Sequence, residues 1–500
     1  MNLTNNKVEV QEEQNIVDQE EEVILLVGEE LISVFRVALP VALTTLMIHS
    51  KSIISMLFLG RMGKIELAGG SLAIGFANVT GFSVIKGLCM GMEPICSQAF
   101  GAKRLSVLTH TYIKMFLLLF LISIPVTFLW LNVEPVLLKL GQDPIILKVA
   151  RAYLIYSIPD LIAHAHVTPL RSFLRTQGLN SPATLVAMCS TAMHLPLTYL
   201  LVTHFKLNVK GLALASSLYT INMNVGLLVY LFFSKTAIKP WMNNAASGPS
   251  SSFLSALHGW GPLLSLAFPS LFSVCLEWWW YEIILFMSGL LANPEACVAA
   301  MGILIQTTGI IYVFPYSLSL SISQRVGHEL GSGQHSRARF AALVGVCIGF
   351  VYGTLAFGLT LCVRSLWGKF YTSDPQVLHM ISGVLPILGL AEVGNSSQTA
   401  ACGALTGSAR PKVGVRINLA AFYLVGIPCS ALLAFKLHVG FQGLWLGLIA
   451  SQAACLGMMI YTLYQTDWKY QAKRADDLTS VATGDKDDDG GGDGGTNLIP

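Results

Sequence analysis

Three glutamates lie within long apolar stretches of the sequence, where a charged side chain has few favourable partners. Glu277 and Glu282 fall in the stretch at 260–287, and Glu392 falls in the stretch at 376–402. A carboxylate at the centre of a membrane helix costs about 3 kcal/mol, so such a residue indicates a function. Because burial disfavours the charged form, a carboxyl of this kind can bind and release a proton near neutral pH. We therefore expect the C-terminal half of the chain to carry proton-exchanging groups.

Aromatic residues surround the first of these carboxylates. Trp280 and Tyr281 follow Glu277 at spacings of three and four residues, which places all three on one helix face. An aromatic wall beside a carboxylate suits a planar or cationic organic solute, whereas enrichment of these residue types at membrane interfaces is the structural alternative. The neutral side chains that could hydrogen-bond a solute, or equally could join helices, are Asn78, Gln306 and Thr307.

The composition indicates that these residues belong to a membrane protein. The 500 residues are 53% hydrophobic and 12% charged, with a mean hydropathy of +0.62, against about 25% charged residues in soluble domains. The net charge is +3, and no basic stripe with interleaved aromatics indicates nucleic acid as a partner. The ten cysteines lie singly, with no CxxC pair. We expect no metal site, no cofactor and no catalytic residues.

Apolar runs of about twenty residues recur along the chain, the length that a helix needs to cross a bilayer. The runs are continuous rather than alternating, which favours helices over a barrel. We therefore predict an all-α polytopic membrane protein with twelve transmembrane helices. The expected spans are 33–58, 67–92, 109–133, 146–168, 183–204, 211–234, 260–287, 296–322, 338–363, 376–402, 413–434 and 441–465.

The two halves of the chain resemble each other, which indicates an internal duplication. Pro40 aligns with Pro269 and Gly101 with Gly331, at offsets of 229 and 230 residues. Six spans in each half make the repeats parallel, an arrangement that suits alternating access around a central cavity. The two prolines predict a bend in the first helix of each half, either as a moving part or as a fixed kink. The expected parts are a disordered acidic tail (1–30), an N-lobe (31–234), a cytoplasmic linker (235–258), a C-lobe (259–466) and a disordered C-terminal tail (467–500).

Lysine and arginine in the short loops predict the orientation. If the N-terminus is cytoplasmic, the loops on that side hold twelve of these residues and the opposite loops hold nine. This bias places both termini in the cytoplasm.

Several motifs resemble the multidrug and toxic compound extrusion (MATE) transporters. The sequence reads EPICSQAFGA from Glu93, QRVGHELG from Gln324, and CLEWW from Cys275. The segments EWWWYEI (277–283), MGILIQTT (301–308) and AEVGNSSQTAACG (391–403) resemble the plant DETOXIFICATION-type branch more narrowly.

The resemblance implies an antiporter that exports organic solutes in exchange for protons, with two six-helix lobes around a V-shaped cavity. In many plant relatives the acid of the CLEWW motif, here Glu277, works with an aspartate in span ten. Asn395 stands at that second position, and Glu392 lies one helical turn earlier. The family comparison therefore assigns proton coupling to Glu277 with Glu392, and it leaves Glu282 and Asn395 as further members of the site.

Two other functions remain as alternatives: a lipid or glycolipid flippase of related two-lobed architecture, and a polytopic membrane transferase. A transferase needs paired aspartates or a His/Asp arrangement near the membrane surface, which the sequence lacks outside its acidic C-terminal tail. We expect a monomer in a lipid bilayer, whose partners are protons and a small organic solute. The branch resemblance allows an endomembrane location (vacuole, Golgi or late endosome) or the plasma membrane.

Overall fold

The computed structural model describes residues 2–139, 144–241 and 259–483, with side chains from residue 25 onward except that of Lys64. These residues form helices and connecting turns without a strand, so the all-α prediction is confirmed. The elements of the first half are α1 (Asn2–Met62), α2 (Lys64–Ala77), η1 (Asn78–Phe82), α3 (Ser83–Cys89), α4 (Met92–Gly101), α5 (Leu105–Leu131), α6 (Val133–Lys139), α7 (Pro144–Tyr156), α8 (Ile158–Thr176), α9 (Ser181–Tyr199), η2 (Leu200–His204) and α10 (Asn208–Phe233).

The second half repeats this pattern of long helices. Its elements are α13 (Gly261–Ser288), α14 (Pro294–Gly331), α15 (His335–Val363), η3 (Trp367–Phe370), α16 (Pro375–Gly407), α17 (Pro411–Asn418), η4 (Leu419–Gly426), α18 (Ile427–Ala431), η5 (Leu432–Lys436), α19 (Phe441–Tyr464) and α20 (Trp468–Thr483).

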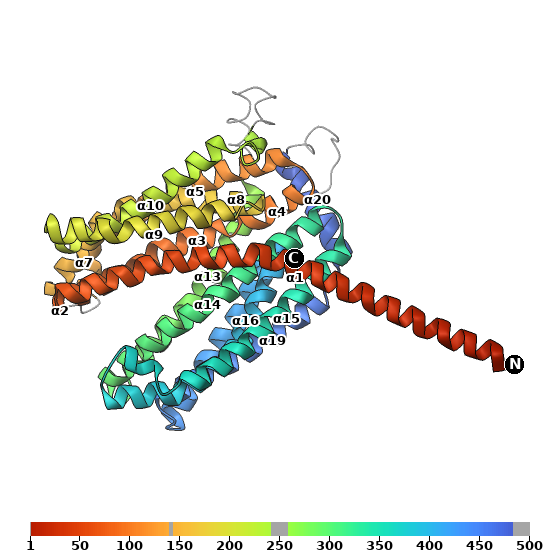
Figure 1. Cartoon of the computed structure of the whole chain (residues 1–500). Helices are drawn as coiled ribbons and strands as arrows, with labels where there is room; N and C mark the ends of the chain where they lie inside the picture. Colours follow the sequence, from red (N-terminus) through yellow and green to blue (C-terminus); the bar gives the residue numbers. More distant parts are fainter. Residues whose placement is uncertain (1, 140–143, 242–258, 484–500) are drawn as a thin grey trace, which may run out of the picture.

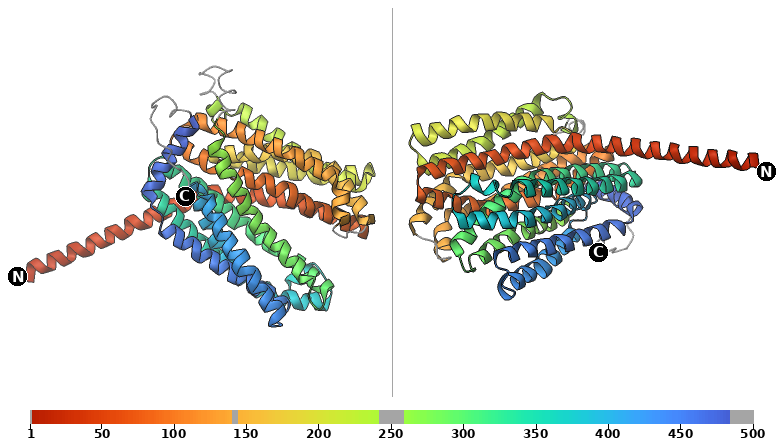
Figure 2. Two further views of the ribbon diagram at one scale, coloured as in Figure 1. Left: turned by 180° about the vertical axis from the view of Figure 1, so that it is seen from behind. Right: turned by 60° about the horizontal axis from the view of Figure 1, so that its bottom comes forward.

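The helices form two bundles that diverge from a common end. Figure 1 shows α5, α8, α9 and α10 in one arm, and α14, α15, α16 and α19 in the other. The view from behind in Figure 2 shows the same separation. Each arm has its own hydrophobic core, so the N-lobe (α1 to α10) and the C-lobe (α13 to α19) pack as separate units over most of their length. We call the end where the arms meet, near α4 and α20, the closed end, and the opposite end the open end.

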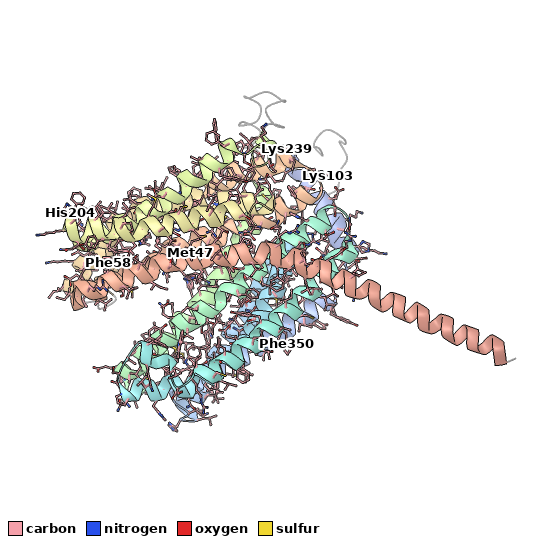
Figure 3. All side chains as sticks on the ribbon, in the orientation of Figure 1. Met47, Phe58, Lys103, His204, Lys239 and Phe350 are labelled. Atoms are coloured by element: carbon pink, nitrogen blue, oxygen red, sulfur yellow. The ribbon has the colours of Figure 1, made fainter. Side chains whose placement is uncertain are left out.

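Eleven helical segments of the described chain are long and apolar enough to cross a membrane. The expected fourth span at 146–168 is not among them. Ser157 divides it into α7, which is short at 13 residues, and α8, which has 19 residues but carries Asp160, Arg171 and Arg175. Residues near loops on opposite expected membrane sides also lie at opposite ends. Figure 3 shows Lys103 and Lys239 at the closed end. It shows Phe58 and His204, which are close in sequence to Arg61 and Lys206 of the opposite loops, at the open end.

The first membrane-spanning segment of each half begins in contact with the other lobe. Near the start of the span Leu25–Met62 of α1, the Val34 carbonyl accepts a hydrogen bond of 2.9 Å from Ser321 of α14. In α13, Ala267 and Leu271 lie against Gly91 and Gly87 of the N-lobe so closely that no Cβ would fit on either glycine. The lobes therefore exchange their leading segments at the closed end.

Helices extend into both tails that the sequence predicted to be disordered. Residues 2–30 belong to α1, and Trp468–Thr483 form α20. The N-terminal run is rich in glutamate and glutamine, and its helix extends the adjoining span without a separate nucleation step. Residues 484–500 and most of the expected linker at 235–258 lie outside the described residues.

A buried stripe explains why α20 is ordered. Trp468, Ala475 and Thr479 are buried at helical spacing, and Arg104 of the N-lobe forms an ion pair of 2.7 Å with Asp476. Toward the C-lobe, Arg474 donates to the Ala409 carbonyl at 3.1 Å. The helix α20 therefore bridges both lobes at the closed end.

The side chain of Arg410 lies near Arg474 of α20. Burial, with Arg474 nearby, lowers the pKa of Arg410 to about 10, a value that leaves Arg410 positively charged at neutral pH.

Candidate solute cavity and intramembrane charges

A cavity of about 460 Å³ lies between the lobes. The N-lobe contributes residues of α1, α2, η1 and α3, and the C-lobe contributes residues of α13 and α14. Its wall includes Asn78, Lys86, Glu277, Trp278, Trp279, Tyr281, Glu282, Gln306, Thr308 and Tyr312. Five of the residues that the sequence predicted for proton coupling or solute contact therefore line one space: Asn78, Glu277, Tyr281, Glu282 and Gln306.

Glu277 lies where the cavity narrows. It lines both the large cavity and an adjoining pocket of about 50 Å³, and it is partly exposed to them. The hydroxyl of Tyr312 and the ammonium of Lys86 face its carboxyl. A carboxyl in this position can reach both a solute in the cavity and groups of the opposite lobe.

Lys86 is a cavity residue that the sequence reasoning missed. Its ammonium lies 4.0 Å from the ring centroid of Tyr316 and 5.0 Å from that of Trp278. These are cation–π contacts, made from α3 of the N-lobe to aromatic rings of the C-lobe. The signal was available, because Lys86 falls inside the expected span at 67–92 and an intramembrane lysine is as informative as a glutamate.

Trp280 does not line the cavity, which corrects the prediction. Its side chain is 1% exposed and packs against Phe422 of η4, with ring centroids 6.1 Å apart. Trp278 and Trp279 occupy the wall in its place. Helical spacing groups residues onto a face, but it does not say which neighbouring element that face meets.

Thr307 is also turned away from the cavity, contrary to the prediction. It is buried, donates to the Ile303 carbonyl at 2.8 Å and accepts from Trp367 Nε1 at 2.7 Å. Its neighbour Thr308 is on the wall instead. Thr307 therefore joins elements within the C-lobe.

Glu392 and Asn395 form a buried pair inside the C-lobe. Asn395 Nδ2 donates to Glu392 Oε2 at 2.8 Å, and the two residues are 1% and 3% exposed. Gln398 and Gln452 extend this polar network from α16 to α19, with long contacts of 3.3 and 3.4 Å to Asn395 Oδ1. Glu392 is not part of the cavity wall, so it would act on the cavity through neighbouring groups rather than by direct solute contact.

The N-lobe holds a buried ion pair that sequence reasoning did not single out. Lys51 Nζ lies 2.9 Å from Asp160 Oδ2, and the side chains are 15% and 5% exposed. His164 Nδ1 lies 3.1 Å from Asp160 Oδ1, and Thr220 donates to the same oxygen. The expectation that intramembrane carboxylates occur in the C-terminal half was therefore too narrow, because Asp160 falls within the expected span at 146–168.

Both predicted bend prolines lie inside continuous helices. Pro40 is within α1 and Pro269 is within α13. The Pro40 carbonyl accepts hydrogen bonds from Thr44 at 2.8 Å and Thr184 at 2.9 Å, which supports the helix where proline alters its bonding. Whether these positions move stays a prediction.

No cluster of three or more His, Cys, Asp or Glu side chains suited to a metal ion occurs in the described part of the chain. The polar groups of the cavity instead offer hydrogen bonds, charge and aromatic faces to an organic molecule.

The two diverging arms, the crossed leading helices and the cavity between the lobes define a polytopic membrane transporter. A family model described as MatE matches residues 40–200 and 269–432, which are equivalent parts of the two lobes. The chain belongs to this MATE family of transporters.

The chain is similar to several DETOXIFICATION proteins of Arabidopsis thaliana. It is 55% identical to Protein DETOXIFICATION 53 over 456 residues, covering 91% of this chain and 92% of that protein. It is 46% identical to Protein DETOXIFICATION 48, covering 91% of this chain and 84% of that protein. The predicted resemblance to the plant branch is thereby confirmed.

Solved structures of the family have the same fold. The crystal structure of the eukaryotic MATE transporter AtDTX14 matches with a TM-score of 0.84 and 29% identity, covering 91% of this chain and 100% of that one. A Vibrio cholerae MATE transporter, VcmN, matches with a TM-score of 0.75 and 18% identity in its bent form, covering 91% of this chain and 99% of that one.

Proposed function

We propose that this transporter exports organic solutes in exchange for protons, and that Glu277 is its principal proton carrier. The observation that supports this most directly is the position of Glu277 on the wall of the cavity between the lobes. An acid there can hold a proton when solute is absent and give it up when solute arrives. Glu392 lies deeper in the same lobe and is proposed as a second titrating group.

The cavity wall favours a solute with an aromatic ring. Trp278, Trp279 and Tyr281 offer ring faces, while Asn78 and Gln306 offer neutral hydrogen bonds. Solute and proton would compete for the cavity, because Glu277 would hold a proton only when solute is absent. Exchange requires this competition. Alternating access then follows from rocking of two lobes that have separate cores.

The surroundings of the protein follow from the loop charges and the family. We propose that the closed end faces the cytoplasm, so that the cavity opens away from it, and that the protein acts as a monomer driven by a proton gradient without a cofactor. The plasma membrane and an endomembrane compartment such as the vacuole, Golgi or late endosome both fit this orientation.

Flux into liposomes tests the proposal. Purified full-length protein would be reconstituted and supplied with fluorescent aromatic solutes that are cationic, neutral or anionic, under an imposed pH gradient. We expect uphill movement of at least one class, abolished by a protonophore and by Glu277→Gln, which keeps side-chain volume but cannot exchange a proton near neutral pH.

Glu295→Gln is the matched control, because Glu295 is an exposed glutamate of the first turn of α14. Uphill movement that survives collapse of the pH gradient and follows sodium would contradict proton coupling.

A further inference from the structure

Lys86 stands at the point where the open cavity gives way to direct contact between the lobes. It lines the cavity of about 460 Å³ and the narrower pocket of about 50 Å³, together with Glu277, Trp278 and Tyr316. The wall of the narrower pocket also includes Pro411 and Gly414 of α17. The pair Lys86 and Glu277 thus marks the floor of the cavity.

The contact between the lobes begins with the next residue of α3. A Cβ on Gly87 would meet the Leu271 backbone at 2.8 Å, and a Cβ on Gly91 would overlap the Ala267 backbone. This backbone contact of α13 with Gly87 of α3 and with Gly91, in the turn that follows α3, leaves no room for a side chain, and we call it the seam. Any separation of the seam must therefore move Lys86 away from the C-lobe.

The ring contacts of Lys86 are made to the C-lobe. Its ammonium lies over the rings of Trp278 and Tyr316, and Glu277 is the charged group of the C-lobe that it faces. Within its own lobe, His49 and Glu93 are also within electrostatic reach of Lys86, and Glu93 is already paired with Arg175. Within the described chain Lys86 makes no ion pair closer than 4.0 Å, so it attracts Glu277 through space rather than by direct contact. Charges that are partly shielded from water are screened weakly by salt, so the attraction acts across the cavity floor.

Other groups near Glu277 do not supply a competing cation. Tyr281 on α13, Tyr312 on α14, Cys402 on α16 and Cys455 on α19 face it, and neither a tyrosine nor a cysteine carries a positive charge. Glu392 on α16 is also within electrostatic reach, but a second carboxylate repels Glu277 when both are charged.

Two further titratable groups line the same large cavity, His49 on α1 and Glu282 on α13. Neither is among the groups that face the Glu277 carboxyl most directly, whereas Lys86 is.

We propose that Lys86 is a positioning residue through which the charge of Glu277 determines whether the seam is closed or parted. This inference rests on Glu277 carrying the proton. When Glu277 is charged, its attraction for Lys86 holds α3 against α13 and keeps the closed end shut. When Glu277 is protonated, that attraction is lost and the seam can part. The proton-loaded transporter is then free to open its closed end, which is the step that returns it for another solute.

Distance measurements between spin labels test this without a solute. Labels would be placed at Lys103 of the N-lobe and Ser336 of the C-lobe, attached through a ketone-bearing non-natural amino acid because the chain has ten native cysteines. In lipid nanodiscs, we expect the distance distribution of the otherwise unaltered protein to shift to longer values between about pH 8 and about pH 5, across which a buried carboxyl titrates.

Variants assign the shift to Lys86. Lys86→Gln and Glu277→Gln should each give the long-distance population already at about pH 8, and the double variant should add nothing further, since both remove one attraction. Lys86→Arg keeps the charge and should restore the pH response. Lys210→Gln is the matched control, because Lys210 also lies over a tyrosine ring, at 5.6 Å from the centroid of Tyr156, but it is not part of the cavity wall.

The outcomes separate this inference from the proposed function. A pH response that persists unchanged in Lys86→Gln, or a distance that does not depend on pH before any substitution, would overturn the role of Lys86. A normal distance titration in a protein that moves no solute under a pH gradient would instead contradict the proposed transport while supporting the role of Lys86.

Discussion

Gly101 and Gly331 occupy equivalent positions in the two lobes, and each lies directly against the backbone of the opposite lobe. A Cβ on Gly101 would overlap the His328 carbonyl, and a Cβ on Gly331 would overlap the Gln98 carbonyl. Side-chain hydrogen bonds join the lobes nearby, from Gln98 to the Gly407 carbonyl at 2.8 Å and between His328 and the Thr176 carbonyl at 2.9 Å. The duplication thus places the same contact twice at the closed end.

Replacing either glycine should force this end apart. We expect Gly101→Ala or Gly331→Ala to destabilise the closed arrangement by about 1 to 3 kcal/mol, the usual cost of overpacking. The measurement is the distance between labels at Lys103 and Ser336, which should lengthen at every pH. Gly358→Ala is the control, because a Cβ at Gly358 meets no atom within 4 Å. Unchanged distances in both closed-end variants would show that the backbones adjust without separating.

The buried pair in the C-lobe gives a second prediction. Glu392→Gln should lower proton-driven flux at least tenfold if Glu392 titrates during the cycle, while the amide keeps the packing against Asn395. Flux under an imposed pH gradient is the readout, and protein yield is the check on folding. Normal coupled flux would mean that α16 contributes no proton-exchanging group and that Glu277 does the coupling without it.

Removing one member of the buried Lys51–Asp160 pair of the N-lobe should lower stability more than replacing both members. Asp160→Asn leaves Lys51 buried without its counter-ion, which should cost about 3 kcal/mol. The double variant Lys51→Met with Asp160→Leu should recover part of that loss, since it leaves no unpaired charge. Thermal unfolding in detergent measures both.

The exposed pair Arg151–Glu134, at 3.2 Å, provides the control for this measurement. Glu134→Gln should change stability by less than about 1 kcal/mol. A similarly small effect of Asp160→Asn would show that water reaches the N-lobe pair.

Substitutions of two tryptophans of α13 should have different effects, one mainly on stability and the other mainly on solute binding. Trp280→Ala should reduce stability by about 3 kcal/mol or more, because its ring fills the C-lobe core beside Phe422. Trp278→Ala should lower the affinity for an aromatic solute with a smaller effect on unfolding, because Trp278 lies on the cavity wall. The two variants would be compared by thermal unfolding and by solute binding measured from fluorescence quenching. Equal losses of stability would contradict the placement.

The sequence predicted the helices and the two-lobed architecture because repeated apolar runs and matching positions in the two halves are visible in the sequence itself. It failed where the answer depended on a partner from elsewhere in the chain. Trp280 is related to Glu277 by helical spacing, yet its ring packs against Phe422 of η4 inside the C-lobe. Asp160 and Lys86 were detectable in principle, since each is a charged residue within an expected span.

The C-terminal helix was missed for a different reason. Averaging composition over residues 467–500 gave weight to the acidic, glycine-rich end, which hid the helical spacing of the buried residues Trp468, Ala475 and Thr479. A shorter window would have shown an amphipathic helix before the glycine-rich segment.

The crossed leading segments of α1 and α13 mean that the two lobes are interlocked and not merely tethered. Val34 binds Ser321 in one direction, and Ala267 packs on Gly91 in the other, so each half completes part of its packing with residues of its counterpart. The chain between residues 241 and 259 should therefore be dispensable as a covalent connection. Halves produced as two separate polypeptides, divided in that stretch, should assemble into one complex and remain together through purification.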